Sequence, residues 1–307
     1  MTWTADRSSI TLVQLRYFQS AAVHLSMTAA AEEFYVAQSA VSSAIAALER
    51  GVGTQLFVRR RSKGLILTPA GSQLLVHVRE LLAALDRAVE SAQGVGEHVR
   101  GTLRLAFFVT IAPFALPELL SRARSLHPEL SLEVVEVDAA QAVEELQSGR
   151  SEIAVGYDFG LANGIVSEVV DATPPYVLLA ADHPLALKPS VGLRELGRER
   201  MILLDLPHSR EYFLDLLHSV GIEPTIRHRT PSFETVRALV GHGHGYSILN
   251  QRPVDALAYD GGRVAAVPIR DQVSPLPVVI SSLNGSHPSA RARAVADLVR
   301  QVFADRR

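Results

Sequence analysis

QSAVSSAIAALERGVGTQLFVRRRSKGLILT, residues 38–68, is the stretch that decides the fold of this chain. The apolar residues of its first half recur at spacings of four and three, at Val41, Ile45 and Leu48. That spacing is typical of a helix with one apolar face, and it predicts a helix over about residues 39–50. A basic run and a glycine then separate two short apolar runs, which predicts a positively charged β-hairpin directly after the helix.

The face of this helix opposite the apolar stripe carries short polar side chains. They are Gln38, Ser39, Ser42 and Ser43. Short side chains allow a helix to settle deeply in the major groove of DNA, and free amides at its first turn favour phosphate. A glutamine can pair with an adenine edge, and serines can bond to phosphates or bases. Considered alone, the same pattern also fits an ordinary helix with a solvated polar face.

The hairpin favours nucleic-acid binding over that alternative. Its cations stand close together without a nearby acid, at Arg59, Arg60, Arg61 and Lys63. Such a group can lie along a phosphate backbone, although a charge run is often only a solvated loop. Upstream, Thr11 is a predicted N-cap of a first helix, and residues 28–35 fit a second, short helix. The sequence therefore predicts a winged helix-turn-helix over residues 1–68.

Charge and composition support this division between a DNA-binding head and a different body. Residues 1–70 carry seven Lys or Arg and four Asp or Glu, whereas the remainder carries 23 and 28. A basic N-terminal region followed by an acidic remainder is the charge distribution expected if the N-terminal region binds phosphate groups. The chain has no cysteine, which excludes disulfides, cysteine-ligated zinc and thiol catalysis. Neither a signal-peptide core nor a membrane-spanning run is present, so we expect a soluble cytoplasmic protein without a membrane partner.

A long linker helix is predicted to follow the head. The linker covers residues 69–96, and its last residues, 93–96, are predicted to form a flexible hinge. Thr68 before Pro69 is a strong start signal. Its apolar residues recur at spacings of three, four and seven, and include Leu74, Leu75, Val78, Leu81, Leu82, Leu85 and Val89. This stripe is too wide to stay in water on an isolated helix. The helix therefore either packs only on its own domain or pairs with the same helix of a second chain.

The body, residues 97–307, alternates strand and helix signals. Strands are predicted at 103–108, 132–137 and 153–157, with helices at 110–126 and 140–147. This alternation argues for a parallel sheet with crossover helices. The chain is predicted to leave this first lobe near residue 172, to form a second lobe over about 173–266, and to complete the first lobe over 267–307. Two lobes joined by crossing strands leave a cleft between them.

The head resembles the LysR-type transcriptional regulators. The resemblance is carried by LVQLRYFQSAAVHLSMTAAAEEFYVAQSAVSSAIAALERGVGTQLFVRRRSKGLILTPAG, residues 12–71, and it is dense and continuous. The chain departs from the family where Ser39 replaces a usual proline and where Ser43 and Ala44 replace longer polar residues. Fewer long side chains imply fewer direct base contacts, so the shape of the operator DNA becomes more important.

The body resembles the effector domain of the same family, which is itself similar to periplasmic solute-binding proteins. The segments GTLRLAFFVTIAPFALPELL, EVVDATPPYVLLAADHPLA and GHGHGYSIL carry this looser match. The resemblance implies an α/β protein with a winged helix-turn-helix, a linker helix and a two-lobed effector domain. It also implies pairing through the linker helix, so that two heads meet a pseudo-palindromic site on double-stranded DNA. We expect a homotetramer, with RNA polymerase as a candidate further partner.

Three predicted helix starts should converge on the cleft and bind a small-molecule effector. They are Thr110, Ser209 and Ser232, each of which offers a hydroxyl and free amides. These groups suit a carboxylate or another small anion, and Arg210 could add a positive charge. Apolar walls are predicted from Phe108, Val109, Phe233 and Tyr246. Taken singly, each helix start also fits an ordinary cap.

Other functions are less well supported by the sequence. His242 and His244 could hold a metal on a strand, but the flanking glycines indicate a turn and no carboxylate has suitable spacing. No nucleophile elbow, phosphate-binding loop or dinucleotide fingerprint occurs, so neither an enzyme nor a cofactor is expected. A solute receptor or carrier without DNA function is the main alternative, and the basic head argues against it.

Overall fold

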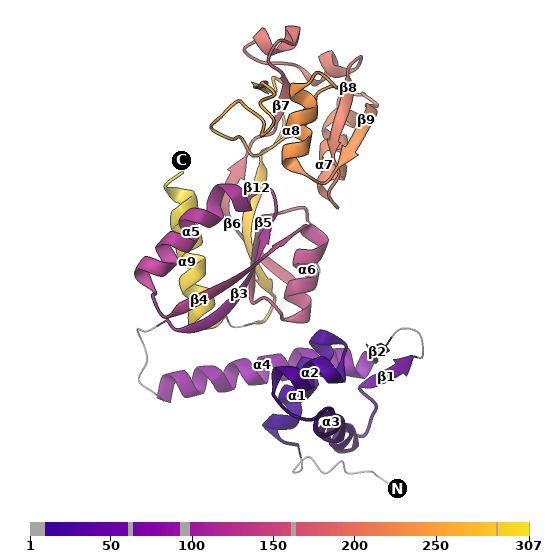
Figure 1. Ribbon diagram of the computed structural model, residues 1–307, viewed down its shortest axis with the longest axis vertical. Helices are drawn as coiled ribbons and strands as arrows, with labels where there is room; N and C mark the ends of the chain where they lie inside the picture. The colour runs from indigo at the N-terminus through magenta and orange to yellow at the C-terminus, as the bar shows by residue number, and fades with distance from the viewer. Residues whose placement is uncertain (1–9, 61–63, 93–98, 161–163, 287, 307) are drawn as a thin grey trace. The chain divides into compact units, whose positions relative to one another are not determined.

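The computed structural model describes residues 10–60, 64–92, 99–160, 164–286 and 288–306. They form two compact units, the first made mainly of residues before 99 and the second mainly of residues from 99 onward. Figure 1 shows the helical first unit in indigo and purple and the mixed second unit in magenta to yellow. Among the described residues, no helix has both the length and the apolar character needed to cross a membrane.

The first unit begins with three helices that are set by local capping signals. They are α1 (Leu12–His24), α2 (Met27–Glu33) and α3 (Gln38–Val52). Thr11 and Gln14 form a capping box at the start of α1, and Ser26 caps α2 through the Ala29 amide. The predicted third helix is confirmed, but it begins one residue earlier and ends two residues later than the apolar stripe indicated. Gly53, whose φ is 80°, terminates it.

The hairpin follows as two short antiparallel strands, β1 (Phe57–Arg60) and β2 (Gly64–Leu67). The long helix α4 (Pro69–Ala92) comes next, and the Thr68 hydroxyl accepts a hydrogen bond from the Gly71 amide at 2.9 Å. Residues 93–96, the predicted hinge, lie outside the described residues. One core joins these elements, and it includes Phe18, Ile45, Leu48 and Leu56 from the head together with Leu75, Val78 and Leu82 of α4. Part of the predicted α4 stripe therefore packs on its own unit.

The second unit contains a five-stranded sheet that forms the centre of lobe I. Its strands are β3 (Gly101–Phe108), β4 (Leu130–Val137), β5 (Ile153–Tyr157), β6 (Ile165–Thr173) and β12 (Leu276–Leu283). Their order is β4-β3-β5-β12-β6. Helices α5 (Ala112–Leu126) and α9 (Ala290–Ala304) lie on one face of the sheet and α6 (Ala139–Ser148) on the other, as Figure 1 shows. The predicted parallel sheet is confirmed for β3, β4 and β5, and β12 joins the same sheet antiparallel to both of its neighbours.

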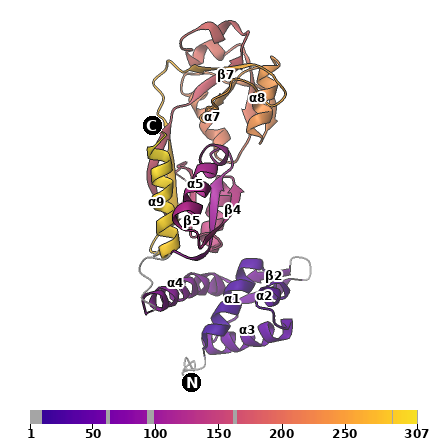
Figure 2. The same cartoon turned by 60° about the vertical axis from the view of Figure 1, so that its left-hand side comes forward.

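Lobe II is built from two smaller sheets and two α-helices, and Figure 2 shows α7 and α8 in this lobe beside β7. One sheet has the order β10-β7-β11, from Ser247–Leu249, Tyr176–Ala180 and Val264–Pro268. The other pairs β8 (Arg200–Leu204) with β9 (Thr225–Thr230) in parallel. The helices are α7 (Ser209–His218) and α8 (Phe233–Gly241), and short 3-10 turns cover Pro184–Leu187 and Leu193–Leu196.

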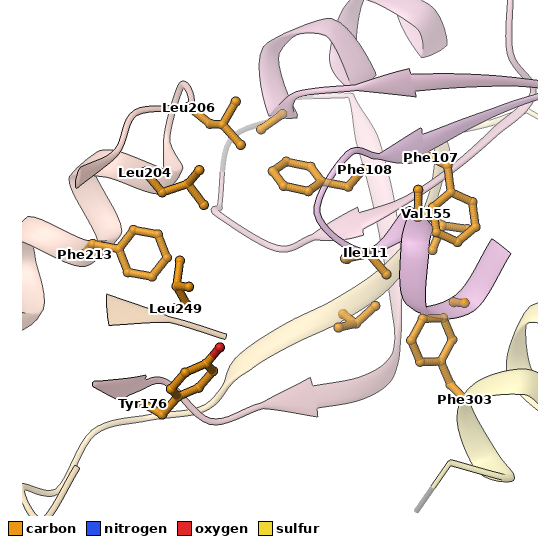
Figure 3. Packing of buried hydrophobic residues seen from close by; sticks show 14 of the residues in the cluster. Phe107, Phe108, Ile111, Val155, Tyr176, Leu204, Leu206, Phe213, Leu249 and Phe303 are labelled. Carbon is orange, nitrogen blue, oxygen red and sulfur yellow. The ribbon is translucent and has the colours of Figure 1, made fainter. Parts of the chain in front are cut away.

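The chain passes between the lobes twice, from β6 into β7 and from β11 into β12. Apolar side chains of both lobes belong to one continuous core cluster. Figure 3 shows Leu204, Phe213 and Leu249 of lobe II grouped on one side and Ile111, Val155 and Phe303 of lobe I on the other, with Phe108 between them. The lobes are therefore in contact through buried side chains as well as through the crossing strands.

Candidate DNA-binding and effector-binding sites

The polar face of α3 is open to solvent. Gln38, Ser39 and Ser43 are exposed and Ser42 is half-buried, whereas the opposite stripe of Val41, Ile45 and Leu48 is buried. Ala37 precedes the helix and provides no side-chain cap, so no cap covers the amides of the first turn. The four residues predicted for DNA contact thus lie together on one accessible face of a helix.

The hairpin is attached to this helix by the carboxylate of Glu49. Its Oε1 atom accepts hydrogen bonds from the amides of Leu56, at 2.8 Å, and Phe57, at 3.2 Å. Arg59 and Arg60 belong to β1, which places their backbones on the hairpin strand. Arg61 and Lys63 lie outside the described residues. The positions of the hairpin strand and of α3 are consequently linked by a charged group that sequence reasoning did not assign to this role.

Tyr35 is a further exposed residue beside α3 that the sequence did not single out. It lies between α2 and α3, has a left-handed backbone with a φ of 54°, and leaves 96% of its side chain exposed. An exposed large aromatic ring at a positive φ is uncommon. Its place in the short segment between α2 and α3 was visible in the sequence, but its exposure was not.

A cavity lies between the two lobes of the second unit. Its polar lining consists of Thr110, Tyr157, Ser209, Tyr212, Asn250 and Gln251. Its apolar lining consists of Leu204, Phe213, Phe233, Leu249 and Leu276. The space open to the centre of a water molecule is about 10 Å³, which is enough for roughly one water. The lobes are thus nearly closed over a small, mostly uncharged chamber.

Three of the eight residues predicted for the effector site line this cavity: Thr110, Ser209 and Phe233. They belong to the approach to α5 and to the starts of α7 and α8, so the three predicted helix starts do converge. Thr110 is not the N-cap, because α5 begins at Ala112 and Ile111 precedes it. Ser232 caps α8 through the Thr235 amide at 3.2 Å and is exposed, whereas the next residue, Phe233, lines the cavity.

The other predicted residues lie outside the lining. Phe108 is buried, with its ring 5.2 Å from that of Tyr157, and Val109 is half-buried at the end of β3. Tyr246 is buried within lobe II, where its backbone pairs with Ile202 and Arg200. Arg210 forms ion pairs with Asp205 at 2.8 Å and with Glu211 at 2.9 Å. None of these four residues supplies the predicted walls or charge of the cavity.

A hydrogen-bond network joins the lobes around the Tyr157 hydroxyl. This oxygen accepts a hydrogen bond from Gln251 Nε2 at 3.0 Å. Burial raises the pKa of Tyr157 to about 12, and it raises the pKa of Tyr212 as well. Both phenols are therefore neutral at pH 7.

Asn250 extends this network. Its Nδ2 donates to the Thr173 carbonyl at 3.0 Å and to the Tyr212 hydroxyl at 3.4 Å. Aromatic pairs close the same interface, with ring centroids 6.5 Å apart for Phe159 and Tyr212. A second pair, Phe114 and Phe233, lies at 6.0 Å. Polar and aromatic contacts together hold lobe II against lobe I.

Sequence reasoning missed the cavity residues that come from strand ends. Tyr157 ends β5, and Asn250 and Gln251 directly follow β10. Ligand sites in open α/β sheets commonly lie beyond the carboxyl ends of strands, and that rule was the available signal. Which strand ends face one another depends on how the two lobes close, and this is not encoded in any local motif.

The histidine segment forms a turn, as its glycines predicted. The φ of Gly243 is 72° and that of Gly245 is 149°. His242 bonds to Asp260 at 2.8 Å, and the ring of His244 lies 5.8 Å from that of His228. Within the described ranges, no group of three or more histidine or acidic side chains is placed to hold a metal ion.

An exposed polar helix beside a hairpin, combined with a two-lobed domain that encloses a cavity, defines the class of ligand-responsive winged-helix regulators. Residues 12–72 match the family described as bacterial regulatory helix-turn-helix protein, lysR family. Residues 96–304 match the LysR substrate binding domain. The chain therefore belongs to the LysR family of transcriptional regulators, with a helix-turn-helix for DNA and a domain for an effector.

Individual relatives agree with this assignment. The chain is 30% identical to the uncharacterized HTH-type transcriptional regulator YnfL of Escherichia coli (strain K12), over 92% of this chain and 96% of that protein. It is 32% identical to a "probable hydrogen peroxide-inducible genes activator" of Mycobacterium avium, over 80% of each chain. The crystal structure of HinK, a LysR family transcriptional regulator from Pseudomonas aeruginosa, matches with a TM-score of 0.65 and 33% identity, and covers 96% of this chain and 99% of that one.

Proposed function

We propose that the α3 face and the hairpin form the DNA contact of this regulator. The observation that carries the proposal is the exposed polar face of α3, with Gln38 and Ser39 in the uncapped first turn. Gln38, Ser42 and Ser43 would read base edges, while Ser39 and the cations Arg59, Arg60, Arg61 and Lys63 would hold phosphates. The proposed functional limits are residues 1–68 for DNA binding, 69–96 for the linker helix and 97–307 for effector binding.

The proposed DNA-bound form is a dimer through the linker helix, within a homotetramer. A hollow of about 500 Å³ in the first unit supports self-association, and it is lined by Ile10, Thr11, Leu12, Leu15, Gly51, Val52 and Leu81. Leu81 of α4 leaves 47% of its surface exposed. A second copy of the same apolar helix is the proposed occupant, because a two-fold pair would place two heads on a pseudo-palindromic operator.

The proposed signal is a small molecule in the inter-lobe cavity, with transcription as the output and no catalytic step. RNA polymerase is the proposed partner that reads the change in DNA geometry, and the cytoplasm is the proposed place of action. A relative is named for induction by hydrogen peroxide. This chain has no cysteine, so it would not detect an oxidant through a sulfenic acid or a disulfide. Reversible binding in the cavity is therefore the proposed mode of control.

A salt titration of DNA binding tests the proposal. The full chain is mixed with duplex from its own upstream region, and affinity is measured from 50 to 300 mM salt. Replacing Arg59 and Arg60 by alanine should weaken binding on all sequences and flatten the logarithmic salt slope by about 1 for each lost phosphate contact. Gln38→Ala should instead change sequence preference at one base position and leave the slope unchanged.

Arg194→Ala in the second unit is the matched control, because it removes a cation far along the chain whose Nε donates to the Val220 carbonyl. Its salt slope should equal that of the wild type. An unchanged slope in the hairpin variant, or equal losses on every operator for Gln38→Ala, would contradict the proposed contacts.

A further inference from the structure

The lining of the inter-lobe cavity carries no cation. None of its eleven residues is Lys, Arg or His. Arg210 directly follows the lining residue Ser209 in sequence. Its guanidinium group already forms ion pairs with the carboxylates of Asp205 and Glu211. Transfer of a carboxylate from water into such a chamber leaves its charge without a cationic partner, which is unfavourable.

The amides at the start of α7 do not replace the missing cation. The Arg210 amide donates to the Leu206 carbonyl at 3.1 Å, and the Tyr212 amide donates to the His208 carbonyl at 3.3 Å. Glu211 also places an acidic side chain in the first turn of the same helix. Two amides at the positive end of this helix thus already donate within the protein, and the adjacent acid makes this end less favourable for an anionic ligand.

Asn250 provides a specific feature for a different ligand. The side chain is buried, with 8% exposed, and lines the cavity. Its Nδ2 faces the Thr173 carbonyl, which can only accept, and this contact fixes the orientation of the amide. Its Oδ1 is buried and has no hydrogen-bond partner among the described residues. A buried acceptor without a donor is a costly arrangement that a bound donor would relieve.

From these contacts we infer that the cavity selects a small, uncharged aromatic molecule that donates a hydrogen bond to Asn250 Oδ1. The inference rests on the proposed function and differs from the expectation of an anionic effector. Phe213 and Phe233 supply apolar walls for the ring, and the neutral hydroxyls of Tyr157 and Tyr212 line the polar side. Because the cavity has room for about one water, the ligand separates the lobes and therefore favours a more open arrangement.

Three nearly isosteric probes separate charge from hydrogen-bond donation. Benzamide is neutral and donates, acetophenone is neutral and does not donate, and benzoate is anionic. Each is titrated to 10 mM against the full-length wild-type protein by calorimetry and thermal shift. Benzamide should bind at least about tenfold more tightly than acetophenone, which corresponds to one hydrogen bond to a buried acceptor. Benzoate should produce no shift.

Variants then locate the binding. Asn250→Leu and Tyr212→Phe should each weaken benzamide, the first by about tenfold, while Ser232→Ala, which changes an exposed cap outside the lining, should leave it unchanged. If Asn250→Leu does not fold, the comparison of the three probes on the wild type still decides the question. Benzoate equal to or better than benzamide, acetophenone equal to benzamide, or no binding by any probe would overturn the inference.

The outcomes are distinct from those of the proposed function. If the ligand-free wild type does not bind DNA but does bind benzamide, the proposed DNA contact is wrong and the inferred selectivity of the cavity stands. If the hairpin variant flattens the salt slope as expected but the wild type prefers benzoate to benzamide, the proposed DNA contact stands and the inferred selectivity of the cavity is wrong.

Discussion

Glu49 illustrates how one side chain can connect two functional elements. Its carboxylate accepts the amides of Leu56 and Phe57 and thereby ties the end of α3 to the beginning of the hairpin. The geometry of the proposed DNA contact therefore depends on a residue that need not touch DNA.

Replacing this carboxylate should reduce the stability of the head. Glu49→Ala leaves two amides without their acceptor, and we expect the free energy of unfolding to fall by about 1–3 kcal/mol. Glu49→Gln retains a carbonyl oxygen and should lose less than half of that. Denaturant melts followed by circular dichroism give the comparison, and equal stability of the alanine variant and the wild type would remove Glu49 from this role.

Tyr157 gives the second unit a dependence on alkaline pH. Its pKa is raised from 10 in the unfolded chain to about 12 in the folded one. Its contribution to stability is complete below pH 10 and is lost as pH rises toward 12, because the unfolded phenol ionises first. The stability difference between wild type and Tyr157→Phe should therefore shrink by about 2 kcal/mol over that interval.

Thermal melts from pH 8 to 11.5 measure this difference. Tyr259→Phe is the control for loss of a phenol hydroxyl, because Tyr259 is 93% exposed. A constant difference between wild type and Tyr157→Phe across the range would contradict the raised pKa.

At the scale of elements, α4 fits against the hairpin through a glycine. A Cβ atom at Gly71 would lie 2.2 Å from the Leu56 carbonyl oxygen, which is far inside contact distance. The first turn of α4 can approach the backbone before β1 this closely because position 71 has no side chain. The entry angle of the long helix is consequently set at this point.

Gly71→Ala should destabilise the first unit, by about 2 kcal/mol or more, because backbone must shift to remove the overlap. Ser72→Ala changes the exposed neighbouring residue and should alter stability by less than about 0.5 kcal/mol. Urea unfolding of both variants provides the test, and a Gly71→Ala protein as stable as Ser72→Ala would show that the contact is not restrictive.

The elements differ in how far the sequence could predict them. Helices α1 to α4 were predictable because caps and apolar stripes are local signals, as Thr11 and Thr68 show. Strand β6 was missed because it is an edge strand whose side chains are mostly exposed and so lacks a strong apolar pattern. The antiparallel direction of β12 could not be predicted from its own residues, because it depends on how the chain returns from lobe II.

The residues that line the cavity were harder to predict from the sequence than the elements that carry them. Convergence of the three helix starts could be predicted from fold resemblance. The assignment failed at Ser232, because its hydroxyl caps α8 through the Thr235 amide while the next residue, Phe233, lines the cavity. The prediction that Arg210 adds a positive charge to the cavity was wrong, because Arg210 lies outside the lining and forms ion pairs with Asp205 and Glu211. Such pairings depend on tertiary structure and cannot be deduced from spacing.

At the scale of the whole molecule, the exposed apolar surface of the first unit bears on assembly. Val76 and Leu81 of α4 leave 46% and 47% of their surfaces exposed. Leu75, Val78 and Leu82 are buried on the same helix against their own unit. Val76 and Leu81 therefore flank the buried stripe on opposite sides of the helix, and self-association would cover the exposed apolar surface at Leu81.

Leu81→Lys should shift the protein toward monomer and weaken operator binding by at least about tenfold, because a charge would be buried in the proposed interface. Gln73→Lys, on an exposed position of the same helix, should leave the assembly unchanged. Analytical ultracentrifugation over a hundredfold concentration range distinguishes the two. A Leu81→Lys protein with the sedimentation of the wild type would place the interface elsewhere.

The order β4-β3-β5-β12-β6 also has a consequence for biosynthesis. β12 lies between β5 and β6, yet it is translated about a hundred residues after β6, when all of lobe II has already emerged. A nascent chain halted before residue 276 would leave β6 with no strand beside it. Ribosome-bound intermediates should therefore fold the head and lobe II before lobe I, and they would depend on chaperones until the final thirty or so residues arrive.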